Sequence, residues 1–287
     1  MDLIAILIAL WLTRLAATDA DWRVMNLFRE YADALSRRIG EGESWNTPFT
    51  VLALMVPPVL VVGLLQLLLA DRIAGLLYLA LSVVVLVLCL PATRADQLLG
   101  RAARAWQRDD GDSVRAVITE LDPRVQLPTD AAELPRQVAL VGLRRNCDLL
   151  FGLLFWFVLL GPFGAVAWRM ACLAGAFGGR DDADDSRPGL LATWYHWLGW
   201  VPARLTVLSY AAMGNFSNTM TAWRESSATH DDNGALLEHG GAAALDLNFL
   251  GERGEVTEQL REARRFLRRT ALLWLAAIAL LTIFLGA

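Results

Sequence analysis

Long apolar runs are the clearest pattern along the chain. About 20 apolar residues in a helix are enough to cross a hydrocarbon core about 30 Å thick. Residues 48–70 form such a run without an internal charge, and Pro57 and Pro58 within it predict a kink. After a short polar turn at 71–72, residues 73–91 form a second apolar run. We expect these two runs to be transmembrane helices that close a hairpin.

Three more apolar runs are less regular or shorter. Residues 149–177 exceed one crossing and contain Gly161-Pro162, which predicts either one kinked span or a re-entrant pair. Residues 270–287 are free of charge and predict a terminal span. The run at residues 3–12 is too short to span and follows no basic region, so we expect an uncleaved helix within the membrane or at its interface.

Residues 190–214 are apolar and rich in tryptophan, yet they contain His196, Pro202 and Arg204. Tryptophan prefers the membrane interface, and irregular backbone at membrane depth is tolerated where it lines a cavity or is buried in protein. This region therefore predicts a broken span or a re-entrant element.

Amphipathic patterns fill the segments between these runs. Residues 22–39 have apolar side chains at helical spacing opposite polar ones, so we expect a helix on the surface of the bundle or the bilayer. Residues 94–146 repeat the pattern in three stretches, the last after a predicted cap at Asp130, and predict a small helical subdomain. The apolar positions of these stretches are Leu98, Leu99, Ala102, Trp106, Val114, Val117, Ile118, Leu121, Leu134, Val138 and Val141.

Arginine residues near the ends of the runs predict the orientation, because basic residues favour the cytoplasmic side of a membrane. Arginines precede the first run and fill the segment between the second and third runs, so we expect both segments in the cytoplasm. The acidic segment 181–185 suits the opposite side, whereas the arginines at 261–269 require the cytoplasm again. Either residues 190–214 cross the membrane or the third run doubles back, and we favour the crossing.

Together these patterns predict an all-α fold class: a polytopic helical membrane protein with amphipathic cytoplasmic helices. The predicted segments are 1–46 with N-terminal membrane-associated and amphipathic helices, 47–91 as a transmembrane hairpin, 92–147 as a cytoplasmic helical subdomain, 148–214 as membrane segments with a broken or re-entrant helix, 215–269 as a cytoplasmic segment, and 270–287 as a C-terminal transmembrane helix.

Composition supports a membrane protein, since 55% of the residues are hydrophobic and the mean hydropathy is +0.40. The net charge of −4 is small and spread along the chain, so no nucleic-acid partner is expected. The three cysteines lack C-x-x-C spacing, and the three histidines lack metal-ligand spacing, so neither a disulfide framework nor a metal site is expected. Motifs for generic nucleotide binding, zinc proteases and serine hydrolases are absent.

Charges inside apolar runs are the better candidates for function, because an ionisable group at membrane depth is costly and tends to face a polar interior. Asp148 and Arg169 also suit span ends, where such side chains reach the headgroups. Arg204 lies two residues after Pro202, where a broken helix leaves backbone groups free. It suits either a two-bond contact with a phosphate or carboxylate, or a structural bond to a neighbouring carbonyl.

Several motifs resemble those of a known family. They are Trp200-Val201-Pro202-Ala203-Arg204-Leu205, Tyr210-Ala211, Gly214 and Ala222-Trp223, with Asn146 and Phe155-Trp156 upstream. Their identities and order, together with the terminal span, resemble the AmpE family over most of the chain. The resemblance implies a sensor or transducer of the bacterial inner membrane, associated with β-lactamase induction and cell-wall recycling. It also implies a muropeptide or nucleotide ligand and a functional link with the cytoplasmic amidase AmpD.

The chain is also similar to the CobD/CbiB family, which makes adenosylcobinamide phosphate by an ATP-dependent amide ligation. Asp148 matches the aspartate of that family's E-N-x-x-D segment, and residues 161–169 resemble its G-A-x-A-Y-R stretch. Residues 202–205 match its P-A-R-L, and Asn233 with Glu238 resemble positions of its N-A-G-x-P-E-A segment. ATP and magnesium are therefore expected cofactors only if the ligase activity is retained.

One departure from the ligase pattern bears on the chemistry, because Arg144-Arg145 stands where that family has Glu-Asn. A guanidinium in place of an acid inverts the local charge at a site built to hold a metal or activate an amine. The departure argues against an enzyme and favours an anionic ligand. The candidate ligand-binding residues are Arg204, Asp148, Arg169, Asn233, Glu238, Asn146, Arg144 and Arg145.

Three hypotheses follow, namely an AmpE-like regulator that senses an anionic ligand, a membrane amide ligase, and a scaffold without a small-molecule site. The ligase hypothesis predicts that five residues converge on one cavity open to the cytoplasm. The scaffold hypothesis predicts the same residues in salt bridges without a cavity. The five residues are Asp148, Arg169, Arg204, Asn233 and Glu238.

Overall fold

The chain is helical throughout the part that can be described. The computed structural model describes residues 2–15, 30–31, 48–69, 75–90, 94–177, 190–229 and 232–285, and these contain helices and no strand. The predicted all-α fold class is therefore confirmed. The predicted amphipathic helix at 22–39, apart from 30–31, and the acidic segment 181–185 lie outside the described residues. The chain divides into two compact units, and each is described by itself.

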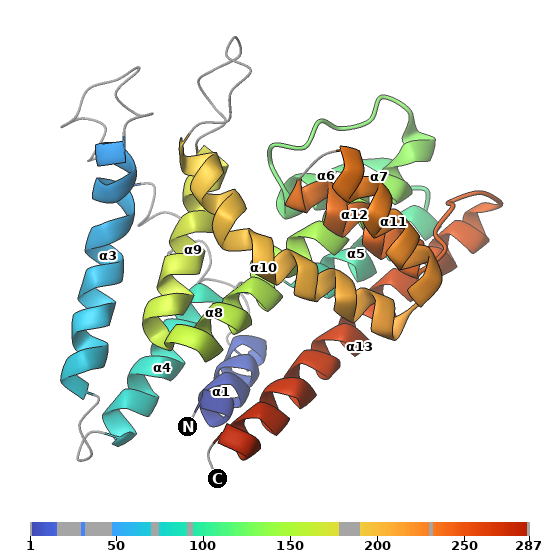
Figure 1. Cartoon of the computed structure of the whole chain (residues 1–287). Helices are drawn as coiled ribbons and strands as arrows, with labels where there is room; N and C mark the ends of the chain where they lie inside the picture. Colours follow the sequence, from blue (N-terminus) through green and yellow to red (C-terminus); the bar gives the residue numbers. More distant parts are fainter. Residues whose placement is uncertain are drawn as a thin grey trace. The chain divides into compact units, whose positions relative to one another are not determined.

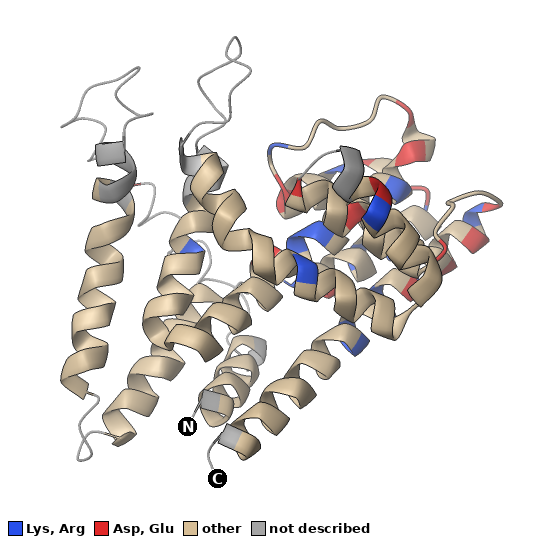
Figure 2. Cartoon of the chain, viewed as in Figure 1, with Lys and Arg blue, Asp and Glu red and all other residues tan. Residues whose placement is uncertain are grey.

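Unit 1 comprises residues 1–92, 152–199 and 282–287. In it α1 packs on α4, and α9 contacts α3, α4 and α8 (Figure 1). Figure 2 shows that α3 and α4 carry no charge. The helices are α1 (Asp2–Leu15), α3 (Pro48–Leu69), α4 (Gly75–Cys89), α8 (Gly152–Leu160) and α9 (Pro162–Phe177), with the first half of α10 (Leu190–Met213).

The third apolar run forms two helices, α8 and α9, which pack against each other. Gly161 separates them with a φ of 68°, a left-handed conformation that costs glycine little because it has no Cβ. A Cβ on Gly164 would lie 2.1 Å from the carbonyl oxygen of Trp156, so the two backbones approach closely. Of the two arrangements left open by the sequence, the structure has a pair of helices rather than one kinked helix.

The predicted break at residues 190–214 is wrong, because α10 is one helix of 24 residues with Pro202 inside it. Proline lacks the N–H that would bond the carbonyl four residues earlier, which is that of Leu198. The indole Nε1 of Trp156 donates to this carbonyl instead, at 3.2 Å. The Thr206 hydroxyl donates to the Pro202 carbonyl at 2.7 Å. A side chain from a distant part of the sequence thus replaces the hydrogen bond that proline removes.

Unit 2 comprises residues 93–151 and 200–281. In it α5, α6 and α7 pack against one another, and α12 packs on both α7 and α11. Figure 2 shows charged residues on all five of these helices. The elements are α5 (Ala95–Gln107), α6 (Gly111–Leu121), the 3-10 helix η3 (Ala131–Glu133), α7 (Leu134–Asn146), the π-helical segment η4 (Cys147–Phe151), α11 (Phe216–Thr229) and α12 (Asn233–Ala244), with the second half of α10 and most of α13 (Arg253–Leu285).

The apolar periodicity predicted the core of this subdomain correctly. Leu99, Ile118 and Leu134 are fully buried, and the other predicted apolar positions of α5, α6 and α7 are buried as well, apart from the half-buried Trp106. The predicted cap also forms, since the Asp130 carboxylate accepts a hydrogen bond of 2.9 Å from the amide of Ala132. Local spacing was enough here because each helix buries one continuous apolar face.

The predicted arginine-rich segment and the predicted terminal span form one helix, α13, of 33 residues. Among the described helices, α13 alone is both long and apolar enough to cross a bilayer, and its apolar part follows the arginines at 261–269. The shorter apolar helices of the described chain cover residues 3–13, 55–69 and 75–89.

Candidate ligand-binding site

Seven of the eight candidate residues belong to unit 2, whereas Arg169 belongs to α9 of unit 1, where its side chain is buried. The seven lie on four elements. They are Arg144, Arg145 and Asn146 at the end of α7, Asp148 in η4, Arg204 on α10, and Asn233 and Glu238 on α12.

Arg144 joins two carboxylates that come from different helices. Its Nη2 donates to Oδ2 of Asp122 at 2.7 Å, and its Nη1 lies 3.1 Å from Oε1 of Glu238. The Asp122 side chain is 4% exposed, and it also accepts hydrogen bonds from the amide and Nε of Arg124. Sequence reasoning missed Asp122, because an aspartate after an amphipathic helix is typical of an ordinary helix end.

The pKa values of the two carboxylates shift in opposite directions. Burial raises the pKa of Asp122, but the charges of Arg145 and Arg124 outweigh burial and hold the pKa below its usual value. Burial also raises the pKa of Glu238, and the charge of Arg144 only partly offsets this effect. Arg144 has two carboxylate partners, and the fold stabilises the ionised form of Glu238 less than that of Asp122.

Arg145 holds the end of α7 to the end of α6 and to η4. Its Nε donates to the carbonyl of Leu121 at 2.9 Å, and its Nη1 donates to Oδ2 of Asp148 at 2.9 Å. Asp148 is 5% exposed and lies in the π-helical segment. Short π-helical segments inside α-helices occur often at functional sites. Asn146, just before η4, is buried, and its Nδ2 has no hydrogen-bond partner within the part of the chain that the structure describes.

Arg204 makes a structural bond within its own helix and a contact with α12. Its Nη1 lies 3.2 Å from both the carbonyl oxygen of Trp200 and Oδ1 of Asn233. Its guanidinium also stacks on the indole of Trp200, with Cζ 3.7 Å from the ring centroid. The bond to a neighbouring carbonyl, one of the two predicted alternatives, is present, and the guanidinium is held in a fixed orientation.

Arg144 and Arg204 lie against two consecutive residues at the start of α12. Asn233 contacts Arg204, and a Cβ on Gly234 would lie 3.2 Å from Cδ of Arg144. The Asp232 carboxylate caps the helix by accepting from the amide of Gly234 at 2.9 Å. Two guanidinium groups therefore flank the first turn of a helix, where the backbone dipole also favours negative charge.

Across the described ranges, no group of three or more His, Cys, Asp and Glu side chains is placed to hold a metal ion. Asp122, Asp148 and Glu238 are instead each paired with an arginine. His239 Nδ1 lies 3.3 Å from the hydroxyl oxygen of Ser226, and His230 is outside the described residues.

The family model described as "Regulatory signalling modulator protein AmpE" matches residues 1–287. The chain belongs to the AmpE family. This membership and the apolar terminal helix α13 indicate a membrane protein.

Two curated relatives of this AmpE-family chain carry the name "Cobalamin biosynthesis protein CobD". The chain is 32% identical to the protein of Chromobacterium violaceum over 42% of its own length and 40% of the relative's. It is 29% identical to the protein of Stutzerimonas stutzeri over 50% of its own length and 48% of the relative's. The matches thus span less than half of each relative. No solved structure gives a significant match.

Proposed function

We propose that the chain is a multi-pass protein of the bacterial inner membrane that modulates β-lactamase induction and cell-wall recycling by sensing an anionic ligand. One observation carries this proposal: Arg144 and Arg204 lie against consecutive residues in the first turn of α12. Family membership supplies the signalling context.

The ligand is a phosphate or carboxylate that competes with Glu238 for Arg144. Arg144 and Glu238 are 25% and 22% exposed at their side chains, so the pair is accessible, whereas Asp122 is buried. Because burial raises the pKa of Glu238, an incoming anion displaces this carboxylate more easily than that of Asp122. Muropeptides and nucleotides both carry suitable groups, and release of Glu238 would free α12 to signal. The proposal includes a functional link with the cytoplasmic amidase AmpD.

Exposed apolar side chains support several membrane passes. Leu67 and Leu68 on α3 are 73% and 74% exposed, Leu76 on α4 is 82% exposed, and Phe284 on α13 is 78% exposed. Large apolar side chains this exposed in several helices suit a lipid environment. In the proposed orientation, the arginine-rich segments face the cytoplasm.

Induction of β-lactamase tests the proposal. The gene is deleted, β-lactamase activity is followed after an inducing antibiotic, and the strain is complemented with wild type, Arg204→Ala or Arg144→Ala. We expect the deletion to change the induction curve, wild type to restore it, and both variants to fail. Arg136→Ala is the matched control, because Arg136 is exposed on α7 and away from the start of α12. An induction curve unchanged by the deletion would refute the proposal.

A membrane amide ligase similar to adenosylcobinamide-phosphate synthase is the second candidate. The identity with the CobD proteins and the grouping of Asp148, Arg204, Asn233 and Glu238 in one unit favour it. Against it, Asp148 and Glu238 each contact an arginine, a donor set that does not fit Mg²⁺. ATP turnover by the purified protein with a cobyric-acid substrate in detergent distinguishes the two candidates. A ligase should hydrolyse ATP under these conditions, whereas a regulator without ligase activity should not.

A further inference from the structure

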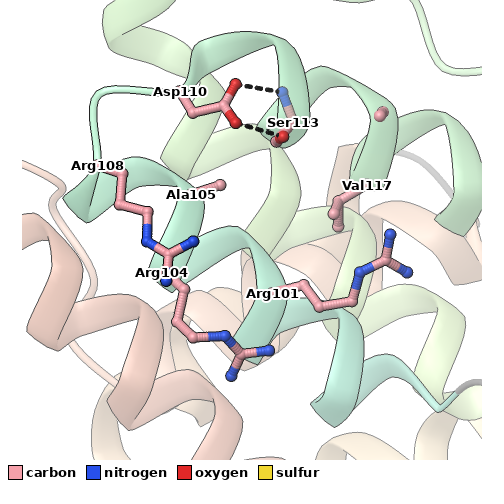
Figure 3. Close-up of a pocket in the computed structure, with 8 residues that line it drawn as sticks. Arg101, Arg104, Ala105, Arg108, Asp110, Ser113 and Val117 are labelled. Carbon is pink, nitrogen blue, oxygen red and sulfur yellow. Dashed lines mark hydrogen bonds between the residues drawn. The ribbon is translucent and has the colours of Figure 1, made fainter.

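A small polar cavity lies between α5 and α6, apart from the start of α12. Its volume is about 200 Å³, and it is lined by Arg101 and Arg104 of α5 and by Arg108, which follows that helix. Asp110 and Ser113, at the start of α6, complete its polar wall. Figure 3 shows the three arginine side chains along the cavity and the hydrogen-bonded Asp110–Ser113 pair above them.

Arg101 and Arg104 share a face of α5 because they are three residues apart, and Arg108 follows four residues later, directly after the helix ends. The opposite face of the helix is buried through Leu98, Leu99 and Ala102. A solvated charged face is the usual outcome of such a pattern. Here, however, the arginines line a concave surface bordered by a second helix, and a concave surface lined by one sign of charge concentrates the field.

The acidic groups near this cavity leave an excess of positive charge. The carboxylate of Asp110 caps α6 by accepting from the amide of Ser113 at 2.9 Å and from its hydroxyl at 2.5 Å. Arg101 pairs with Glu120 at 2.7 Å, and both side chains are well exposed, so this pair exchanges readily with solvent or another anion. Among the residues that the structure describes, Arg104 has neither a hydrogen bond nor an ion pair.

We propose that this cavity binds a phosphate group. Guanidinium groups match phosphate geometry with paired N–H donors, and three of them line this cavity. The volume suffices for a phosphate with ordered water, since one water occupies about 30 Å³ in the liquid. The phosphate comes from a lipid headgroup or from a soluble phosphate, and the two sources share this chemistry. This site does not depend on the proposed regulatory function.

Hydrogen exchange of the backbone amides in residues 95–121, followed by mass spectrometry on the full chain, tests this proposal. One arm uses detergent micelles with inorganic phosphate or with chloride at equal ionic strength. The other arm uses nanodiscs of phosphatidylcholine with or without phosphatidylglycerol. We expect slower exchange in one arm, which identifies the source as soluble phosphate or as lipid.

Single-residue variants decide whether such protection is specific. Arg104→Gln and Arg108→Gln should each require about tenfold more of the protecting phosphate or anionic lipid. Arg136→Gln on α7 removes the same charge outside the cavity and should behave like wild type. Unchanged melting temperatures check that the exposed substitutions leave the fold intact. Exchange that phosphate and anionic lipid both leave unchanged, or an equal loss of protection in Arg136→Gln, would overturn the proposal.

Discussion

Nη2 of Arg144 donates a hydrogen bond of 2.7 Å to Oδ2 of Asp122, which lies 22 residues earlier in the chain. The pair ties the end of α7 to the residue that follows α6. Because the same guanidinium also contacts Glu238, it links these two helices to α12. One side chain therefore couples the small helical subdomain to the helix whose first turn forms the candidate site.

Asp122→Asn should destabilise the fold, because it leaves two arginines next to a neutral amide. The Asp122 side chain is 4% exposed, so water cannot fully take the place of the lost carboxylate in solvating these arginines. We expect a loss of about 2 kcal/mol in the free energy of unfolding, within the range for breaking a partly buried pair. Asp112→Asn is the control, since that side chain is 96% exposed in its pair with Arg115. Denaturant titration in detergent should separate the two variants, and equal midpoints would contradict the prediction.

Glu238→Gln should change the pH dependence of stability. The folded pKa of Glu238 is raised by burial above its usual value of 4.5. Between that value and the raised one, the folded state keeps a proton that the unfolded state has lost, so stability falls as pH rises through this window. The variant has no carboxyl group that loses a proton in this window, so its stability should not fall in this way. Its melting temperature should therefore rise relative to that of wild type as the pH increases. A constant difference between the two proteins across the window would show that the carboxyl does not contribute.

Trp156→Phe should destabilise α10 by removing the donor to the Leu198 carbonyl. A lost hydrogen bond to a partly buried carbonyl costs about 1 kcal/mol. Pro202→Ala supplies the missing backbone N–H, so Trp156→Phe should cost less in that background, which a double-mutant cycle measures. Trp197→Phe serves as the control because Trp197 is 64% exposed. Equal costs of Trp156→Phe in both backgrounds would rule out this role of the indole.

The same hydrogen bond explains why the sequence misled at residues 190–214. Pro202 predicted a broken helix from local rules, but the compensating donor, Trp156, lies 42 residues before Leu198 and no local pattern reveals it. By contrast, the buried faces of α5, α6 and α7 could be predicted because apolar spacing within one helix decides them.

The candidate site was only partly predictable for a similar reason. Resemblance to known families supplied Asn233 and Glu238, and the charge pattern supplied Arg204. The Arg144–Asp122 pair depends on how three helices pack, and Asp122 alone has no distinctive neighbours in the sequence. Long-range ion pairs of this kind require the structure.

Gly214→Ala should disturb the candidate site from a distance, because Gly214, directly after α10, lies against the last residue of α12. A Cβ there would lie 2.3 Å from the carbonyl oxygen of Ala244, which also accepts a hydrogen bond of 2.8 Å from the amide of Asn215. The obstacle is backbone, so the two helices must move apart. We expect a loss of about 2 kcal/mol in stability, as for overpacked cores.

The movement should also weaken the contact between Arg204 on α10 and Asn233 on α12, so Gly214→Ala should complement the deletion strain poorly. Gly254→Ala is the matched control, because a Cβ at that helical position meets nothing within 4 Å and alanine favours helix. Melting temperature and β-lactamase induction together check the argument. The prediction is contradicted if Gly214→Ala lowers stability yet restores full induction. The protein would then respond despite an altered first turn of α12, so the spacing of α10 and α12 would not control signalling.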